Sequence, residues 1–189
     1  MRKNILIEFS PKITYKEWVF YEGNGRINDF FSENQLIDYL EEILEKIPSK
    51  LLDSYEKNGW KIIITNQRNI EEDYNFEYEV YGCTDYEQKT TIVYANKNGI
   101  DSLLHELAHY LDSLIEISKT IEWENIYKKE QIFYKSEDLK DYFTATDSQF
   151  ECFADAFLVY ILNKDLLKRK SERTYKIINN LFTYFDYII

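Results

Sequence analysis

Near Gly99 the apolar pattern of this chain changes from short β-prone runs to helical spacing, and this change constrains the fold more than any other feature. Before it lie three short β-prone runs, 60–65, 76–81 and 90–95, separated by acidic or Gly-containing segments. After it, apolar residues recur at helical spacing: Leu103, Leu104, Leu107, Ala108, Leu111, Leu114 and Ile115. We therefore predict an α+β fold that is mostly helical, with a small mixed sheet before the first of the later helices.

The flanking segments extend this prediction in both directions. We expect further helices over residues 32–47, 49–57, 121–135, 148–163 and 172–188. Pro48 separates the first two, and Asp101 is expected to cap the helix that follows the sheet. Two more β-prone runs, 4–9 and 17–21, make about residues 1–30 a strand-rich extension, with turn residues at 22–25.

Composition indicates a single domain over residues 1–189. The chain has only five Gly and two Pro, and no repeat or low-complexity linker divides it. Its formal net charge of −11 repels phosphate groups, and no Lys/Arg-rich stripe offsets this field. Nucleic acids and anionic membranes are therefore excluded as expected partners.

The N-terminus carries basic residues, but Glu8 interrupts its apolar run before a signal-peptide core can form. The chain also lacks the ~18 consecutive apolar residues that a membrane span needs. We expect a cytoplasmic protein, with non-classical export or toxin-like delivery as the alternative. Cys83 and Cys152 show no paired ligand spacing, so we expect buried thiols.

The helix after the sheet contains the segment His105-Glu106-Leu107-Ala108-His109. At 3.6 residues per turn, both histidines project from one face and reach one ion. Zinc held in this way lowers the pKa of water toward ~7, and the glutamate, here Glu106, takes the proton as general base. A chance match is the alternative, but the chain has only two histidines and both occupy the pattern.

A third zinc ligand cannot be a histidine, because none remains, and the extended three-histidine motif would need one where the chain has Ile115. We favour Glu151, which completes a set of two histidines and one glutamate. Asp155, one helical turn later, is expected to accept the second N–H of a ligating histidine. Helix capping is the alternative for Glu151, since residues 148–151 match the S-x-x-E capping box.

Three other side chains are candidates for the site. Asp112 and Asp155 are alternatives to Glu151 as a ligand or as its support, although we expect a solvated helix face for Asp112. Cys152 is discounted as a thiolate ligand, because on a helix it points about 100° away from Glu151.

Three segments of the chain carry a family resemblance: Tyr81-Gly82 ahead of the β-run 90–94, residues 104–112, and residues 150–157. With them the sequence resembles the catalytic domain of anthrax lethal factor and the related bacterial Pro-Pro endopeptidases, over about residues 50–163. The resemblance implies a zincin-like metallopeptidase domain with one Zn²⁺ bound by His105, His109 and Glu151, and with Glu106 as the base. It also implies secretion, in contrast to the location expected from the N-terminus.

The family has a tyrosine seven residues before its ligand glutamate, thought to stabilise the oxyanion, where this chain has Thr144. Tyr142, two residues away, is the substitute that we consider, with an ordinary packed tyrosine as the alternative. Loss of an oxyanion donor costs ~10² to 10³ in turnover, so the departure affects the expected activity.

Zinc peptidases of this type present an edge strand to which an extended substrate adds by backbone hydrogen bonds. We expect the run 90–95, and in it Thr91, Ile92 and Val93, to bind the substrate in this way. The expected function is zinc-dependent hydrolysis of peptide bonds in a peptide or protein substrate. The alternatives are a non-catalytic, zinc-stabilised interaction module and, less favoured, a metal-free helical protein that binds a basic partner.

Overall fold

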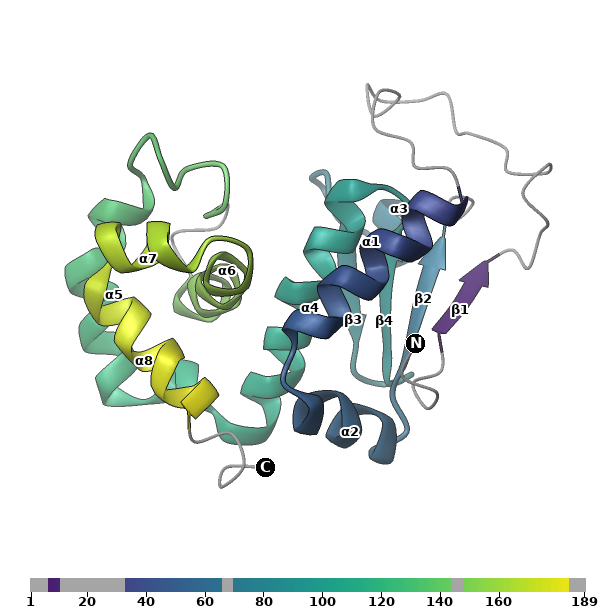
Figure 1. Ribbon diagram of the computed structural model, residues 1–189, viewed down its shortest axis with the longest axis horizontal. Helices are drawn as coiled ribbons and strands as arrows, with labels where there is room; N and C mark the ends of the chain where they lie inside the picture. The colour runs from purple at the N-terminus through teal and green to yellow at the C-terminus, as the bar shows by residue number, and fades with distance from the viewer. Residues whose placement is uncertain (1–6, 11–32, 66–69, 144–147, 184–189) are drawn as a thin grey trace. The chain divides into compact units, whose positions relative to one another are not determined.

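The structure is a computed structural model that describes residues 7–10, 33–65, 70–143 and 148–183 (Figure 1). The chain divides into two compact units, residues 1–106 and 107–189, and the boundary passes through one continuous helix, α4 (Lys97–Ile115). The prediction of a single domain stays a prediction. None of the described helices has the length and hydrophobicity that a membrane span requires.

The first unit contains a four-stranded mixed sheet in the order β1-β2-β4-β3 (Figure 1). Its strands are β1 (Ile7–Ser10), β2 (Lys61–Thr65), β3 (Gly82–Asp85) and β4 (Thr90–Tyr94). The first three in spatial order run parallel, and β3 pairs antiparallel with β4 at one edge. This confirms the predicted α+β fold with a small mixed sheet. The predicted strand 17–21 and the turn after it lie outside the described residues.

The predicted strand over 76–81 is wrong, because the strand of this region begins only at Gly82. The preceding chain forms a short helix, α3 (Ile70–Tyr74), and turns at Asn75, which has a φ of 56°. The backbone N–H of Val80 then donates to the Glu71 carboxylate at 3.1 Å instead of to a neighbouring strand. Aromatic and β-branched residues here pack as a loop against the cluster around Ile70, which alternation along the sequence does not distinguish from a strand.

Two helices precede the main sheet strands, as predicted. They are α1 (Glu33–Lys46) and α2 (Ser49–Lys57), and Pro48 lies at the N-cap of the second. The tyrosine hydroxyl of Tyr55 in α2 donates to the carbonyl oxygen of Lys61 at 2.9 Å. This bond fixes α2 to the first residue of β2.

Helix α4 begins four residues earlier than predicted, and Asp101 is not its cap. The side chain of Asn96 accepts a hydrogen bond from the backbone N–H of Gly99 at 2.8 Å, which is the N-cap interaction. Asp101 lies inside the helix, where it accepts hydrogen bonds from Lys97 and from Tyr39 of α1. Burial, with Asp101 as the next cause, raises the pKa of Tyr39, so its phenol stays protonated and donates.

Gly99 sets how closely α4 approaches the end of β4. A Cβ atom at this position would lie 2.1 Å from the carbonyl oxygen of Tyr94, well inside contact distance. We therefore expect Gly99→Ala to lower the free energy of unfolding by about 2 kcal/mol or more, because overpacking of this kind shifts backbone. Urea denaturation measures the change. Asn98→Ala, exposed in the same turn, is the control and should change stability by less than about 0.5 kcal/mol; equal effects of both variants would contradict the prediction.

The second unit begins with the end of α4, residues 107–115, and its other described elements are also helices, joined by turns. Its elements are the 3₁₀ helix η2 (Ile117–Lys119), α5 (Ile121–Tyr134), α6 (Gln149–Leu162), α7 (Lys164–Lys170) and α8 (Glu172–Thr183). Helix α6 is buried around most of its circumference. The predicted helices are confirmed, the last of them as far as Thr183, because residues 184–188 lie outside the described residues. Helix α7 was not predicted. Asn163 starts it by accepting a hydrogen bond from the backbone N–H of Leu166 at 3.2 Å.

A buried carboxylate on α5 caps the start of α8. Glu130 is 5% exposed and accepts hydrogen bonds from the Ser171 hydroxyl at 2.6 Å and from the N–H and hydroxyl of Thr174 at 3.0 and 2.7 Å. The backbone N–H of Arg173 donates to its other oxygen at 3.2 Å. These donors at a helix N-terminus require an acceptor.

We expect Glu130→Gln to lower the free energy of unfolding by about 2 to 3 kcal/mol, because the amide group turns a donor toward buried donors. Thermal or urea denaturation checks this value. Glu124→Gln, on the exposed side of the same helix, is the matched control and should change stability by less than about 0.5 kcal/mol. A Glu130→Gln protein as stable as the control would show that Glu130 does not cap α8.

Candidate metal centre

Helix α4 carries both histidines of the chain. Its apolar face is fully buried, so the helix is fixed in rotation: Leu103, Leu104, Leu107, Ala108 and Leu111 are each 0% exposed. His105 and His109 are four residues apart in this continuous helix and therefore project one turn apart from one side. The helix that the motif requires is thus present.

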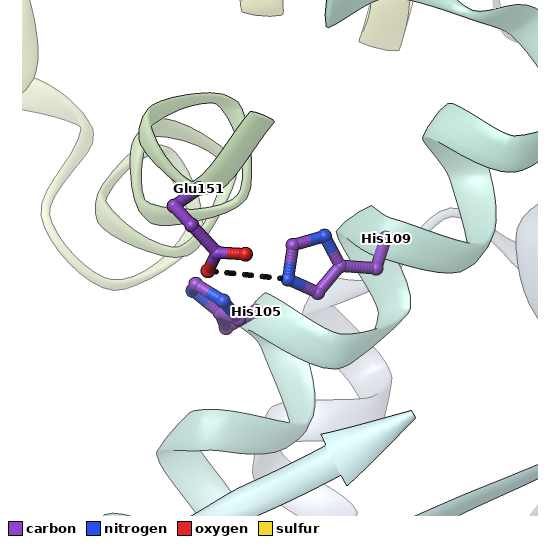
Figure 2. A group of neighbouring side chains, drawn as sticks. All are labelled: His105, His109 and Glu151. Carbon is purple, nitrogen blue, oxygen red and sulfur yellow. Dashed lines mark ion pairs between the residues drawn. The ribbon is translucent and has the colours of Figure 1, made fainter. Parts of the chain in front are cut away.

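Glu151 of α6 lies beside the two histidines (Figure 2). His105, His109 and Glu151 each offer one ligand atom, and these atoms all lie within 4.8 Å of one another. Within the second unit, Nε2 of His109 is 3.5 Å from Oε2 of Glu151. Two imidazole nitrogens and a carboxylate oxygen at this separation suit a transition-metal ion, and a His2Glu donor set is one that catalytic zinc uses.

Two residues next to Glu151 in the sequence, Phe150 and Ser148, contact this group in different ways. The ring of Phe150 stacks on the His109 ring, with centroids 4.2 Å apart and an interplanar angle of 18°. The Ser148 hydroxyl accepts a hydrogen bond from the backbone N–H of Glu151 at 3.3 Å, so Ser148 is the N-cap of α6. The capping serine predicted from the S-x-x-E pattern is therefore present, while the carboxylate of Glu151 points to His109 (Figure 2).

Glu106, expected as the general base, is held by a threonine of β3. Its side chain is 6% exposed, and Oε2 accepts a hydrogen bond from the Thr84 hydroxyl at 2.6 Å. A second, longer contact of 3.4 Å joins the same hydroxyl to the backbone oxygen of Glu106. Sequence reasoning missed Thr84, because no spacing along the chain links residue 84 to residue 106.

The prediction that Asp112 lies on a solvated helix face is wrong, because this residue is only 2% exposed. Its two carboxylate oxygens accept hydrogen bonds from the backbone N–H and the hydroxyl of Ser118, at 2.7 and 2.5 Å. The carboxylate therefore fixes the turn between α4 and η2. Asp155 is also buried, at 3% exposed, one turn after Glu151, and its role as support for a ligand stays a prediction.

Tyr142 lies in a half-buried turn, where its backbone N–H donates to the carbonyl oxygen of Leu139 at 2.9 Å. The next residue, Phe143, anchors this turn by stacking on Tyr134 with centroids 4.3 Å apart. Thr144 lies outside the described residues. The catalytic role of Tyr142 stays a prediction. Cys83 and Cys152 are both buried and form no disulfide, as expected.

The expected edge position of the strand over residues 90–95 is wrong. β4 lies inside the sheet, between β2 and β3, so the backbone groups of Thr91, Ile92 and Val93 are engaged by neighbouring strands on both sides. The edge strand of the described sheet on this side is β3. Edge position depends on strand order, which the run of β-prone residues does not reveal.

The backbone of β3 offers hydrogen-bonding groups on its outer side. The Tyr94 N–H donates to the Tyr81 carbonyl at 3.0 Å, which identifies this as a hydrogen-bonded pair. In an antiparallel ladder such pairs alternate, so Gly82 and Thr84, opposite Val93 and Thr91, fall in the non-bonded pairs. The N–H and C=O groups of Gly82 and Thr84 therefore point away from β4.

Comparisons with known proteins agree with the fold and with the resemblance. The family model described as "Anthrax toxin lethal factor, N- and C-terminal domain" matches residues 90–181. Among solved structures, the Pro-Pro endopeptidase PPEP-2 from Paenibacillus alvei is similar with a TM-score of 0.61 and 22% identity, over 86% of this chain and 96% of that one. No curated protein sequence matches the chain. The predicted resemblance is confirmed: the chain is similar to the lethal factor family over residues 90–181 and shares its fold with a Pro-Pro endopeptidase.

Proposed function

We propose that this protein is a zinc-dependent endopeptidase. The observation that carries the proposal is the convergence of His105, His109 and Glu151, whose ligand atoms lie within 4.8 Å of one another. Three protein ligands leave an open coordination position, which distinguishes catalytic zinc sites from closed structural ones. The resemblance to lethal factor and the fold shared with a Pro-Pro endopeptidase support the same conclusion.

The proposed chemistry assigns one role to each side chain. Zinc, when bound, would polarise the substrate carbonyl and lower the pKa of a water. Glu106 would take the proton of the attacking water and later deliver it to the leaving amine. This role requires a carboxylate oxygen that accepts no other hydrogen bond. Oε1 of Glu106 accepts none from the described residues, whereas Oε2 accepts one from Thr84.

Two further residues are proposed to assist. Asp155, buried one turn after Glu151, would accept the N–H of a ligating histidine and fix its tautomer. Tyr142 would donate a hydrogen bond to the oxyanion from a turn that Phe143 anchors.

The substrate is proposed to be an extended peptide segment that adds to β3. Gly82 is buried, so the outward N–H and C=O groups of the half-buried Thr84 would supply the backbone hydrogen bonds of such an added strand. Because backbone groups are common to all peptides, this contact would orient the chain without selecting its sequence. β3 thereby takes the place that the sequence had suggested for residues 90–95.

A peptide library incubated with the zinc-loaded protein tests the proposed function. We expect cleavage at internal peptide bonds, which a chelator abolishes and added zinc restores. Mass spectrometry of the products identifies the cleaved bonds. Binding of peptides without cleavage by any zinc-loaded preparation would instead support a non-catalytic, zinc-stabilised interaction module.

A further inference from the structure

We infer that Thr84 is a positioning residue for Glu106, in addition to any contact that its backbone makes with substrate. This inference rests on the proposed function, in which Glu106 is the general base. It begins from the 2.6 Å hydrogen bond that the Thr84 hydroxyl donates to Oε2 of Glu106. A hydroxyl that donates to a carboxylate makes a short, charge-assisted bond, stronger than one between neutral groups.

Glu106 needs such a partner because its long side chain can rotate about several bonds, which leaves the orientation of its carboxylate undefined. A glutamate has three side-chain torsions, so a buried carboxylate without a fixed neighbour samples several orientations. Helix α4 fixes only the backbone of Glu106, whereas the Thr84 hydroxyl fixes one of the two carboxylate oxygens. The other oxygen, Oε1, is thereby assigned to proton transfer.

Thr84 is itself well fixed, which a positioning residue requires. Before it, Gly82 lies so close to α4 that an added Cβ would be 2.7 Å from the Ser102 hydroxyl. After it, Asp85 accepts hydrogen bonds from the Tyr74 hydroxyl at 2.9 Å and from the backbone N–H of Gln88 at 2.8 Å. The strand around Thr84 is thus held on both sides, and threonine, being β-branched, has few side-chain rotamers.

The backbone of Thr84 also lies on the side of β3 where the substrate strand is proposed to add. The N–H and C=O of Thr84 point away from β4, while its hydroxyl reaches Glu106. Addition of a substrate strand to β3 would therefore bring the peptide backbone to the residue that orients the base. This couples substrate alignment to the orientation of Glu106 within a single residue.

Thr84→Val tests the inference, because valine keeps the shape and β-branching of threonine but lacks the hydroxyl. We expect kcat to fall about 10- to 100-fold with KM unchanged, the size of loss that misplacement of a catalytic group produces. Thr84→Ser should restore kcat to within about threefold of the wild-type value, since it keeps the donor. Zinc content should equal that of the unaltered protein in both variants.

Thr91→Val is the matched control, at the position directly opposite on β4. Its hydroxyl is buried and makes no hydrogen bond among the described residues, so its loss should leave kcat unchanged. A fall in kcat of the same size for Thr91→Val would overturn the inference, because it would trace the effect to the strand and not to the bond with Glu106.

A double-mutant cycle on the metal-free protein gives a readout that does not depend on activity. Urea unfolding of Thr84→Val, Glu106→Ala and the double variant measures their coupling, expected at about a tenfold factor or more in the unfolding equilibrium constant. Absence of coupling, or a kcat loss from Thr84→Val that is undiminished in the Glu106→Ala background, would overturn the inference. Coupling in a protein that cleaves no peptide would refute the proposed function, and the catalytic role of Thr84 with it.

Discussion

Glu106→Gln is expected to lower kcat for peptide hydrolysis about 10³-fold while the protein keeps its zinc, because general-base catalysis contributes ~10² to 10⁴. Glutamine has the shape of glutamate and accepts the Thr84 hydrogen bond through its carbonyl oxygen, so the site keeps its structure. What it loses is the ability to take a proton. Steady-state kinetics on a cleaved peptide, together with metal analysis of the same preparation, measures both quantities.

Glu116→Gln is the control for this substitution. Glu116 follows the end of α4 and pairs at the surface with Lys119, so its carboxylate has no part in the proposed chemistry. The peptidase activity of the Glu116→Gln protein should equal that of the unaltered protein. Hydrolysis by Glu106→Gln within tenfold of the wild-type rate would exclude Glu106 as the base.

Glu151→Gln is expected to weaken zinc binding by at least about 100-fold. Loss of a carboxylate that only supports a ligand typically costs ~10- to 100-fold, and loss of a ligand itself should cost at least as much. The substitution separates the two roles of this residue. Glutamine satisfies the S-x-x-E/Q capping box as well as glutamate does, so a residue that only caps α6 would tolerate it. A zinc ligand would not, because a neutral amide oxygen replaces the charged carboxylate. Competition with a chromophoric chelator measures the affinity.

Two variants near Glu151 show what loss of the helix cap alone and loss of a supporting carboxylate alone do to zinc affinity. Ser148→Ala removes the hydroxyl that accepts a hydrogen bond from the backbone N–H of Glu151. We expect it to lower the free energy of unfolding by about 1 kcal/mol and to leave the zinc affinity unchanged. Asp155→Asn should lower zinc affinity by about 10- to 100-fold if Asp155 supports a ligating histidine. An affinity for Glu151→Gln equal to that of Ser148→Ala would assign Glu151 to capping alone.

The candidate metal-binding group could be predicted from the sequence because its key spacing is local. Four residues along a helix bring His105 and His109 together whatever the rest of the chain does, and the apolar face of α4 shows that the segment is helical. Glu151 was reached by elimination, since no third histidine exists. Its approach to His109 depends on helix packing that no pattern encodes.

The remaining features depend on tertiary structure. Which strand lies at the sheet edge follows from strand order. Because β3 and not β4 lies there, the proposed substrate contact moves from residues 91–93 to Thr84. The hydrogen bond between Thr84 and Glu106 joins residues 22 positions apart. Asp112 was expected in solvent because it is charged, but the turn that follows α4 supplies two donors that bury it.

An anomalous difference map from a crystal of the zinc-loaded protein, recorded at the zinc absorption edge, tests the central claim most directly. We predict one peak per chain, within about 2.0 to 2.2 Å of a nitrogen of His105, a nitrogen of His109 and a carboxylate oxygen of Glu151. A peak bound elsewhere, a sulfur ligand from Cys83 or Cys152, or full zinc loading with no peak at these three side chains would contradict it.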